Sequence, residues 1–164
     1  MENSFLPEGY ELPTSGGSYF KLKQGANKFR IVSKPVIGFL GWTLDNKPER
    51  RRTKAEFNEM ETKDGKIRHF WAFAVWSFDA KAVQVMEITQ ATIQTQLKSL
   101  FDDEAWGSPL AYNITINRSG ESLETVYTTQ PAPPTELAED AKLKIVETSI
   151  NLNALFEGND PFEV

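Results

Sequence analysis

Basic and aromatic side chains are interleaved in the first half of this 164-residue chain. Residues 20–70 contain 13 Lys and Arg against 6 Asp and Glu, whereas the whole chain has a formal net charge of −5. Cations can follow a phosphate backbone and flat rings can stack on exposed bases, so this combination predicts binding of single-stranded DNA without sequence readout. The candidate DNA-binding residues are Lys21, Lys23, Lys28, Arg30, Lys34, Phe39, Trp42, Arg50, Arg51, Arg52, Lys54, Arg68, Phe70 and Trp76.

The stretch 67–78 carries the densest group of rings, and its β-branched and aromatic content favours a strand. Successive side chains of a strand point to opposite faces, so Phe70 and Trp76 share a face with Arg68, while His69 and Trp71 lie on the other. We expect the face with Arg68 to be outward, which makes Phe70 and Trp76 the better stacking candidates. Core packing is the alternative for each ring, and a β-bulge would exchange the faces.

Residue types required by several enzyme and metal sites are missing from the sequence. The chain has no cysteine and one histidine, His69, so it lacks thiolate ligands and the second histidine of a metal pair or catalytic relay. It contains neither a Gly-x-x-x-x-Gly-Lys-Ser/Thr loop nor a Gly-x-Ser-x-Gly elbow. The acids 102–104 are typical of a solvated patch. We therefore expect a protein that is not an enzyme and that has no metal or cofactor.

The sequence also gives an expectation about cellular location. Residues 1–8 lack the basic segment and apolar stretch of a secretory signal. The longest apolar run, 70–76, is far shorter than the roughly 18 residues that indicate a membrane span. We expect a cytoplasmic protein with no membrane partner.

The order of predicted elements favours a mainly β fold. Three strands are predicted at 28–44, 67–78 and 83–89, and two further strands end at 128. Between them a helix is predicted from about 90 to 104, because the spacing of Ile93, Leu97, Leu100 and Phe101 places them on one helical face. This order is that of a five-stranded OB-fold barrel with a helix between strands 3 and 4. The alternative is an open antiparallel sheet with a helix on one face.

The rest of the chain divides around this predicted domain. Residues 1–18 are rich in Pro, Gly and Ser and are expected to form a flexible N-terminal arm, followed by the OB-fold domain at 19–130. Residues 131–156 are a linker and a helical segment with an apolar stripe. Residues 157–164 are expected to be an acidic, disordered tail.

Three stretches of the chain resemble the single-stranded DNA-binding proteins of tailed phages. They are 19–32 (YFKLKQGANKFRIV), 38–42 (GFLGW) and 155–162 (LFEGNDPF). The resemblance implies an OB-fold core and a role in DNA replication, recombination and repair, in the host cell cytoplasm if a phage encodes the chain. It also implies that the tail element Asp160, Pro161 and Phe162 recruits replication proteins such as a polymerase, helicase or nuclease. Glu163 and Val164 follow that element, which departs from the family pattern.

Two other classes of function stay open at this point. Residues 45–66 are polar, contain the run Arg50 to Lys54 and are predicted to form a basic loop. This loop and the C-terminal helix could serve a protein-interaction adaptor of a replication complex. A strand-annealing recombinase or a divalent-metal nuclease is the third reading. Oligomeric state, footprint and preference for DNA over RNA are not determined by the sequence.

Overall fold

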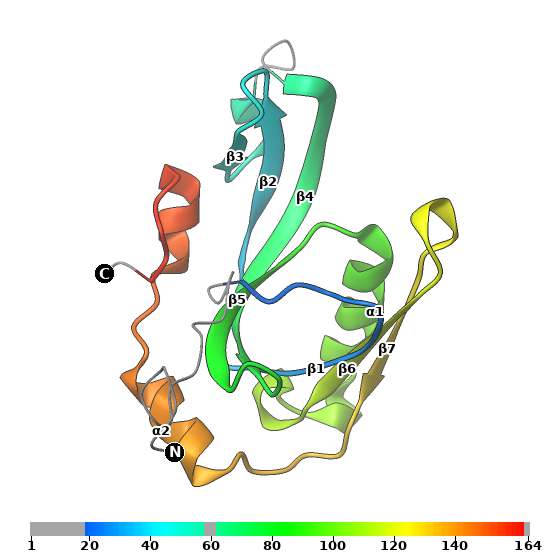
Figure 1. The fold of residues 1–164 in the computed structure, drawn as a ribbon, viewed down its shortest axis with the longest axis vertical. Coiled ribbons are helices and arrows are strands. Elements are labelled where there is room, and N and C mark those ends of the chain that lie inside the picture. The colour runs from blue at the N-terminus through cyan, green and yellow to red at the C-terminus, as the bar shows by residue number, and fades with distance from the viewer. Residues whose placement is uncertain (1–18, 58–61, 163–164) are drawn as a thin grey trace, which may run out of the picture.

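The computed structural model describes residues 19–57 and 62–162, and these form a mainly β fold built on one antiparallel sheet (Figure 1). The N-terminal arm predicted at 1–18 lies outside the described residues. The strands are β1 (Gly25–Ile31), β2 (Val36–Thr43), β3 (Pro48–Arg51), β4 (Thr62–Ser77), β5 (Ala82–Ile88), β6 (Ile114–Ser119) and β7 (Val126–Pro131). The α-helices are α1 (Ala91–Phe101) and α2 (Glu139–Glu147), and the longest 3-10 helix is η6 (Leu152–Glu157).

The sheet has the strand order β3-β2-β4-β1-β6-β7, with β5 paired to β4. β4 is 16 residues long and serves two parts of the molecule. Its first part pairs with β2, and together with β3 they form an arm that projects from the body (Figure 1). Its last part pairs with both β1 and β5 in the body. β1 and β2 are the two halves of the long bent strand that the sequence predicted, and Pro35, which has no N–H to donate, lies at the bend.

Helix α1 follows β5 and precedes β6, as predicted, but the sheet has seven strands and is open, which corrects the expectation of a five-stranded OB-fold barrel. α1 packs beside β7 and its glutamines use the strand edges that would otherwise pair. Gln96 Nε2 donates to Tyr127 O at 2.9 Å, and Thr129 Oγ1 donates to Gln96 Oε1 at 2.7 Å. Gln94 Nε2 donates to Ile88 O at 2.9 Å. Side-chain amides of α1 therefore bond to β5 and β7, and these two strands do not pair with each other.

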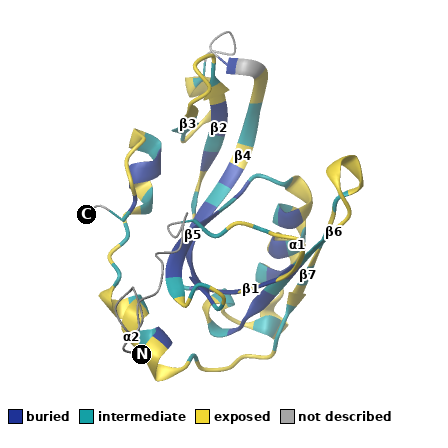
Figure 2. Ribbon diagram, viewed as in Figure 1, coloured by how far each residue is buried: buried dark blue, intermediate teal, exposed yellow. Residues whose placement is uncertain are grey.

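The main core lies inside the curved body, between the sheet and α1 (Figure 2). Ile93, Leu97 and Leu100 of α1 are buried in it, which confirms the helical stripe predicted from their spacing. The segment that leads into β1 crosses this core. Phe20 N donates to Val85 O at 2.8 Å, and the Phe20 ring lies 5.4 Å from the ring of Phe29.

The opposite, outer face of β4 and β5 is covered by the C-terminal segment, which we define as residues 137–162. Leu155 of η6 joins a buried cluster with Phe70, and Ala141 of α2 joins a second cluster with Trp76. Residues 157–162, for which the sequence predicted disorder, continue this packing. Pro161 is buried and Phe162 is half-buried against the cluster around Leu155.

Candidate nucleic-acid interface

The arm has two faces, and strand register assigns its side chains to them. Arg51 of β3, Phe39 of β2 and His69 of β4 are directly paired, so they lie in one row on one face. Ile37 and Trp71 form the next row on this face. Because Trp71 has the same parity as the core residue Phe73, this inner face of the arm is continuous with the interior of the body.

Five rings follow one another along the inner face, and we call them the ring strip. The Phe39 and His69 rings lie 5.1 Å apart, and the rings of Trp71 and Phe101 lie 6.4 Å apart. Phe57 continues the strip toward the tip of the arm, where its ring covers Gly41. A Cβ at position 41 would lie 2.9 Å from Phe57 Cε1, so only glycine permits this contact. The ring strip comprises Phe57, Phe39, His69, Trp71 and Phe101.

Hydrogen bonds fix the middle of the ring strip. Trp71 Nε1 donates to His69 Nε2 at 3.2 Å, so His69 Nε2 acts as an acceptor and carries no proton. The proton therefore sits on Nδ1, which lies 3.0 Å from Gly38 O and donates to it. Both nitrogens of the imidazole and the indole N–H are used within the protein. What these side chains offer to a ligand is their ring faces.

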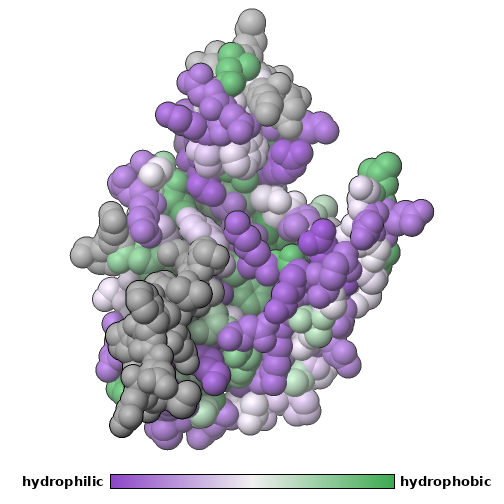
Figure 3. Space-filling view, viewed as in Figure 1, coloured by the Kyte–Doolittle hydropathy of each residue, from purple (hydrophilic) through white to green (hydrophobic). Residues whose placement is uncertain are grey.

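The ring strip is accessible. His69 is exposed, the other four rings are half-buried, and the neighbouring Ile37 is 51% exposed. Another apolar surface lies away from the strip at the tip of the β6–β7 hairpin, where Leu123 is fully exposed (Figure 3).

Cations border the ring strip at both ends. The Arg51 guanidinium lies over the Phe57 ring, 5.2 Å from its centroid, and donates to Glu49 Oε2 at 2.6 Å. At the other end Lys34 is exposed, and Lys98 of α1 forms an exposed ion pair with Asp102. The inner face therefore combines ring faces with cations, as binding of a single strand requires.

The outer face of the arm is arranged differently, because acids and the C-terminal segment lie against its cations. Arg50 donates to both carboxylate oxygens of Glu87 at 2.5 and 3.2 Å, and this pair is largely buried. Arg52 donates to Asn153 Oδ1 at 2.8 Å and lies over the Phe156 ring. A groove of about 960 Å³ separates β3 from the C-terminal segment. The wall on the β3 side includes the cations Lys47, Arg50, Arg51 and Arg52 and the acids Glu49 and Glu56, and the other wall includes Glu157 and Asp160.

Phe70 and Trp76 share the outer face of β4, as their parity predicted, but the expectation that they are open to a ligand is wrong. Phe70 is 0% exposed and Trp76 is 5% exposed. The ring of Phe156 lies 5.7 Å from that of Phe70, so the C-terminal segment covers this face. The alternation in the sequence correctly predicted the face of β4 on which these rings lie. It did not predict that the C-terminal segment covers this face.

Phe39 and Trp42 lie on opposite faces of the arm because side chains alternate along β2. They lie three positions apart in β2, so their side chains point to opposite faces of the arm. Trp42 shares the outer face with Arg50 and Arg68, and it is 36% exposed. One strand lying on one face cannot contact both rings.

Arg30 is a buried structural residue, which corrects its place among the candidate DNA-binding cations. It is 4% exposed, and burial lowers the pKa of its guanidinium from the ordinary value. Its Nε donates to Asn113 Oδ1 at 2.7 Å, Nη1 to Leu110 O at 3.2 Å and Nη2 to Thr135 O at 2.8 Å. The side chain ties β1 to two later segments of the chain.

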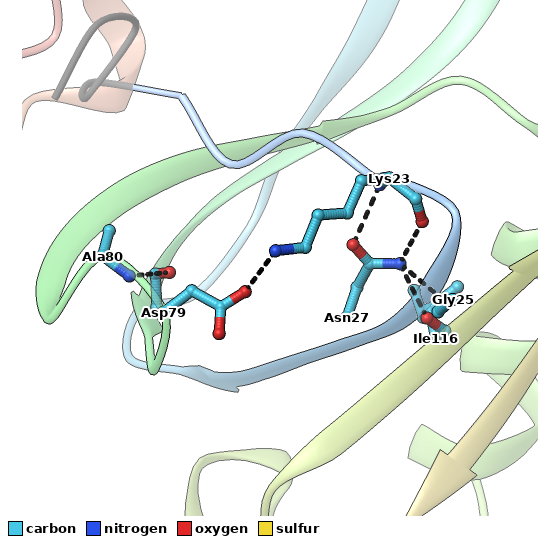
Figure 4. Close-up of polar contacts among 7 residues, drawn as sticks. Lys23, Gly25, Asn27, Asp79, Ala80 and Ile116 are labelled. Atoms are coloured by element: carbon cyan, nitrogen blue, oxygen red, sulfur yellow. Dashed lines mark hydrogen bonds and ion pairs between the residues drawn. The ribbon is translucent and has the colours of Figure 1, made fainter.

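The lead-in lysines form a separate surface on the body. Asn27 is buried and holds the turn before β1, because its amide group bonds both the N–H and the carbonyl of Lys23 (Figure 4). Lys23 Nζ reaches Asp79 Oδ2 at 2.7 Å, and Lys28 Nζ lies 4.6 Å from the centre of the Phe78 ring. Lys21 is exposed nearby in sequence, and Lys54 is exposed in a 3-10 turn of the arm. The predicted cations therefore do not converge on one channel.

The structure brings together residues that the sequence analysis did not select. His69 and Trp71 were assigned to the inward parity of β4, and that parity is correct. However, β4 extends beyond the body, so its inward face becomes an accessible surface in the arm (Figures 1 and 2). The sequence analysis began this strand at 67, whereas β4 begins at Thr62, so much of the part that projects from the body was not predicted.

Within 19–57 and 62–162 there is no cluster of His, Asp or Glu that could hold a metal ion, and no helix has the length and apolar character to cross a membrane. Comparison of the chain with protein-family models, curated proteins and solved structures finds no match.

Proposed function

We propose that this protein binds single-stranded DNA without sequence preference, with the bases stacked along the ring strip. The observation that carries the proposal is a succession of five accessible rings on one face of the arm, bordered by cations. Stacking on such rings is worth about 1–3 kcal/mol per base and tolerates every base, because each has a π-face.

The hydrogen bonds within the strip support the absence of sequence preference. Base edges are distinguished by donors and acceptors that the protein presents to them. The ring nitrogens of His69 and Trp71 hydrogen-bond to each other and to Gly38 O. The strip therefore favours stacking over hydrogen-bonded readout.

The element order supports an open variant of the OB-fold. A bent first strand, the β4–β5 hairpin, a helix and a final β6–β7 hairpin follow one another as in that fold, and β1 pairs with β6. With the sequence resemblance, this order supports a place among the single-stranded DNA-binding proteins of tailed phages, acting in replication, recombination and repair.

The tail element supports a second contact, with replication proteins. Asp160 is exposed, whereas Pro161 is buried and Phe162 is half-buried against the protein's own cluster. A partner that binds the Phe162 ring must first draw it from that cluster. A protein-interaction adaptor would require this release of Phe162 and would not require DNA binding, and in this it differs from the main proposal.

Two tryptophans on opposite faces of the arm test the proposal. We expect Trp71→Ala to weaken binding of fluorescein-labelled oligo-dT by about tenfold, from the loss of one stacked base, and Trp42→Ala to change it less than about twofold. Trp71→Phe is the control for folding, because it keeps a ring and should bind like the wild type. A larger loss of binding in Trp42→Ala than in Trp71→Ala would place the DNA on the outer face. If the wild-type protein binds no oligo-dT, the proposal is wrong and the adaptor function is favoured.

A further inference from the structure

A cavity of about 360 Å³ opens at the foot of the ring strip, where the arm meets the body. Its walls come from the β1–β2 bend, from β4, from the end of α1 and from the turn before β6. The apolar side chains that line it include Ile31, Ile37, Trp71, Phe73, Phe101 and Leu110. This volume lies within the range of small-ligand sites, and an apolar lining is typical of them.

The cavity begins where the ring strip ends. Trp71 and Phe101 are the last two rings of the strip, and both line the cavity. A strand whose bases stack on Phe39, His69 and Trp71 therefore delivers its next base to the cavity mouth.

The two serine side chains of the cavity are bonded to the backbone. Ser33 Oγ donates to Lys34 O and accepts from Ala74 N, and Ser108 Oγ accepts from Leu110 N. The base that enters is thus held by shape and ring contact, as in binding without sequence preference.

Two cations stand at the rim. Lys34 is exposed, and Lys98 is held by Asp102 in an ion pair whose side chains are 69% and 63% exposed. Exposed pairs of this kind contribute little, so Lys98 can exchange Asp102 for a phosphate at small cost. A base in the cavity would leave its two flanking phosphates at this rim.

We propose that the cavity takes up one unstacked nucleobase of the bound strand, with Lys34 and Lys98 meeting the flanking phosphates. This inference rests on the proposed DNA-binding function and adds a defined base site to it. An apolar side chain of a protein would fit the walls, but it would bring no anionic partner for Lys34 and would leave Lys98 with Asp102 alone.

The test compares two polymers that differ only in their bases: oligo-dT and an abasic deoxyribose-phosphate strand of the same length. Leu110 is 45% exposed at the cavity, and Leu110→Trp fills it. We expect this variant to bind oligo-dT about five- to tenfold more weakly and the abasic strand as the wild type does. Leu143→Trp, at a 58% exposed position on α2, is the matched control and should change neither affinity.

Each other result has a defined meaning. Unchanged binding of oligo-dT by Leu110→Trp overturns the base site and leaves the proposed function standing. An equal loss of affinity for oligo-dT and for the abasic strand also overturns the base site, because the effect would then come from contacts with the sugar-phosphate backbone and not with a base. Wild-type protein that does not prefer oligo-dT to the abasic strand contradicts stacking, and with it the proposed function. Lys34→Gln, at an exposed position, should weaken binding of both polymers and reduce the slope of log affinity against log salt concentration by about 0.7. An unchanged slope would mean that Lys34 does not contact a phosphate.

Discussion

Phe156 packs against Phe70 with their ring centroids 5.7 Å apart, although 86 positions separate them in the chain. The contact depends on Gly38, where a Cβ would lie 2.7 Å from Phe156 Cε1. It fastens η6 to the outer face of the sheet and hides rings that would otherwise compete with the ring strip for bases.

We expect Phe156→Ala to lower the free energy of unfolding by about 2–3 kcal/mol, somewhat below the cost of truncating a fully buried ring. The variant should also expose the cluster around Phe70, so that proteases cleave the C-terminal segment sooner. Urea unfolding and limited proteolysis measure both effects. Leu143→Ala, at an exposed position on α2, is the control, and equal behaviour of the two variants would mean that η6 adds nothing to stability.

Arg30→Met is expected to destabilise the protein by about 3 kcal/mol, because the oxygens of Asn113, Leu110 and Thr135 lose their charged donor. Folded Arg30→Met protein should still bind oligo-dT with wild-type affinity. Lys34→Met, at an exposed cation, should show the opposite pattern, with weaker DNA binding and unchanged thermal unfolding. A DNA-binding defect in folded Arg30→Met protein would restore Arg30 to the interface.

Tyr112→Phe is expected to stabilise the protein by about 1 kcal/mol, because the buried Tyr112 hydroxyl has no hydrogen-bond partner among the described residues. Burial, and then the charge of Asp103, raises the pKa of this tyrosine above 10.0, and burial likewise raises the pKa of Tyr19. Below about pH 10 both states keep these protons, whereas above it the unfolded chain loses them first and stability falls. Urea unfolding from pH 8 to 11 should show a smaller fall for Tyr112→Phe, and identical profiles would argue against a buried hydroxyl.

The charges of the tail are expected to oppose DNA binding by lowering the positive potential around Arg51, which lines the groove beside β3 and also borders the ring strip. Glu157 and Asp160 lie across that groove, so Glu157→Gln with Asp160→Asn should tighten oligo-dT binding a few-fold at low salt and not at high salt. The matched control is Glu121→Gln with Glu124→Gln on the β6–β7 hairpin, an equal change of charge elsewhere. Equal tightening by both pairs would assign the effect to net charge alone. Deleting 158–164 is expected to tighten binding as well, but it also removes the packing of Pro161 and Phe162.

Local periodicity in the sequence determined the elements and the sidedness of their side chains. The spacing of Ile93, Leu97 and Leu100 predicted α1, and alternation in β4 separated Trp71 from Phe70. Both follow from the fixed geometry of helices and strands, which a short window of residues contains.

The tertiary structure alone decided which side is open, whether the sheet closes and which cation is buried. Phe70 is hidden by Phe156, β7 bonds to Gln96 of α1 and does not pair with β5, and Arg30 is enclosed by Asn113 and Thr135. Each outcome depends on partners far away in the chain. The exposure of a side chain depends on what packs against it, so the neighbouring residues in the sequence do not predict it.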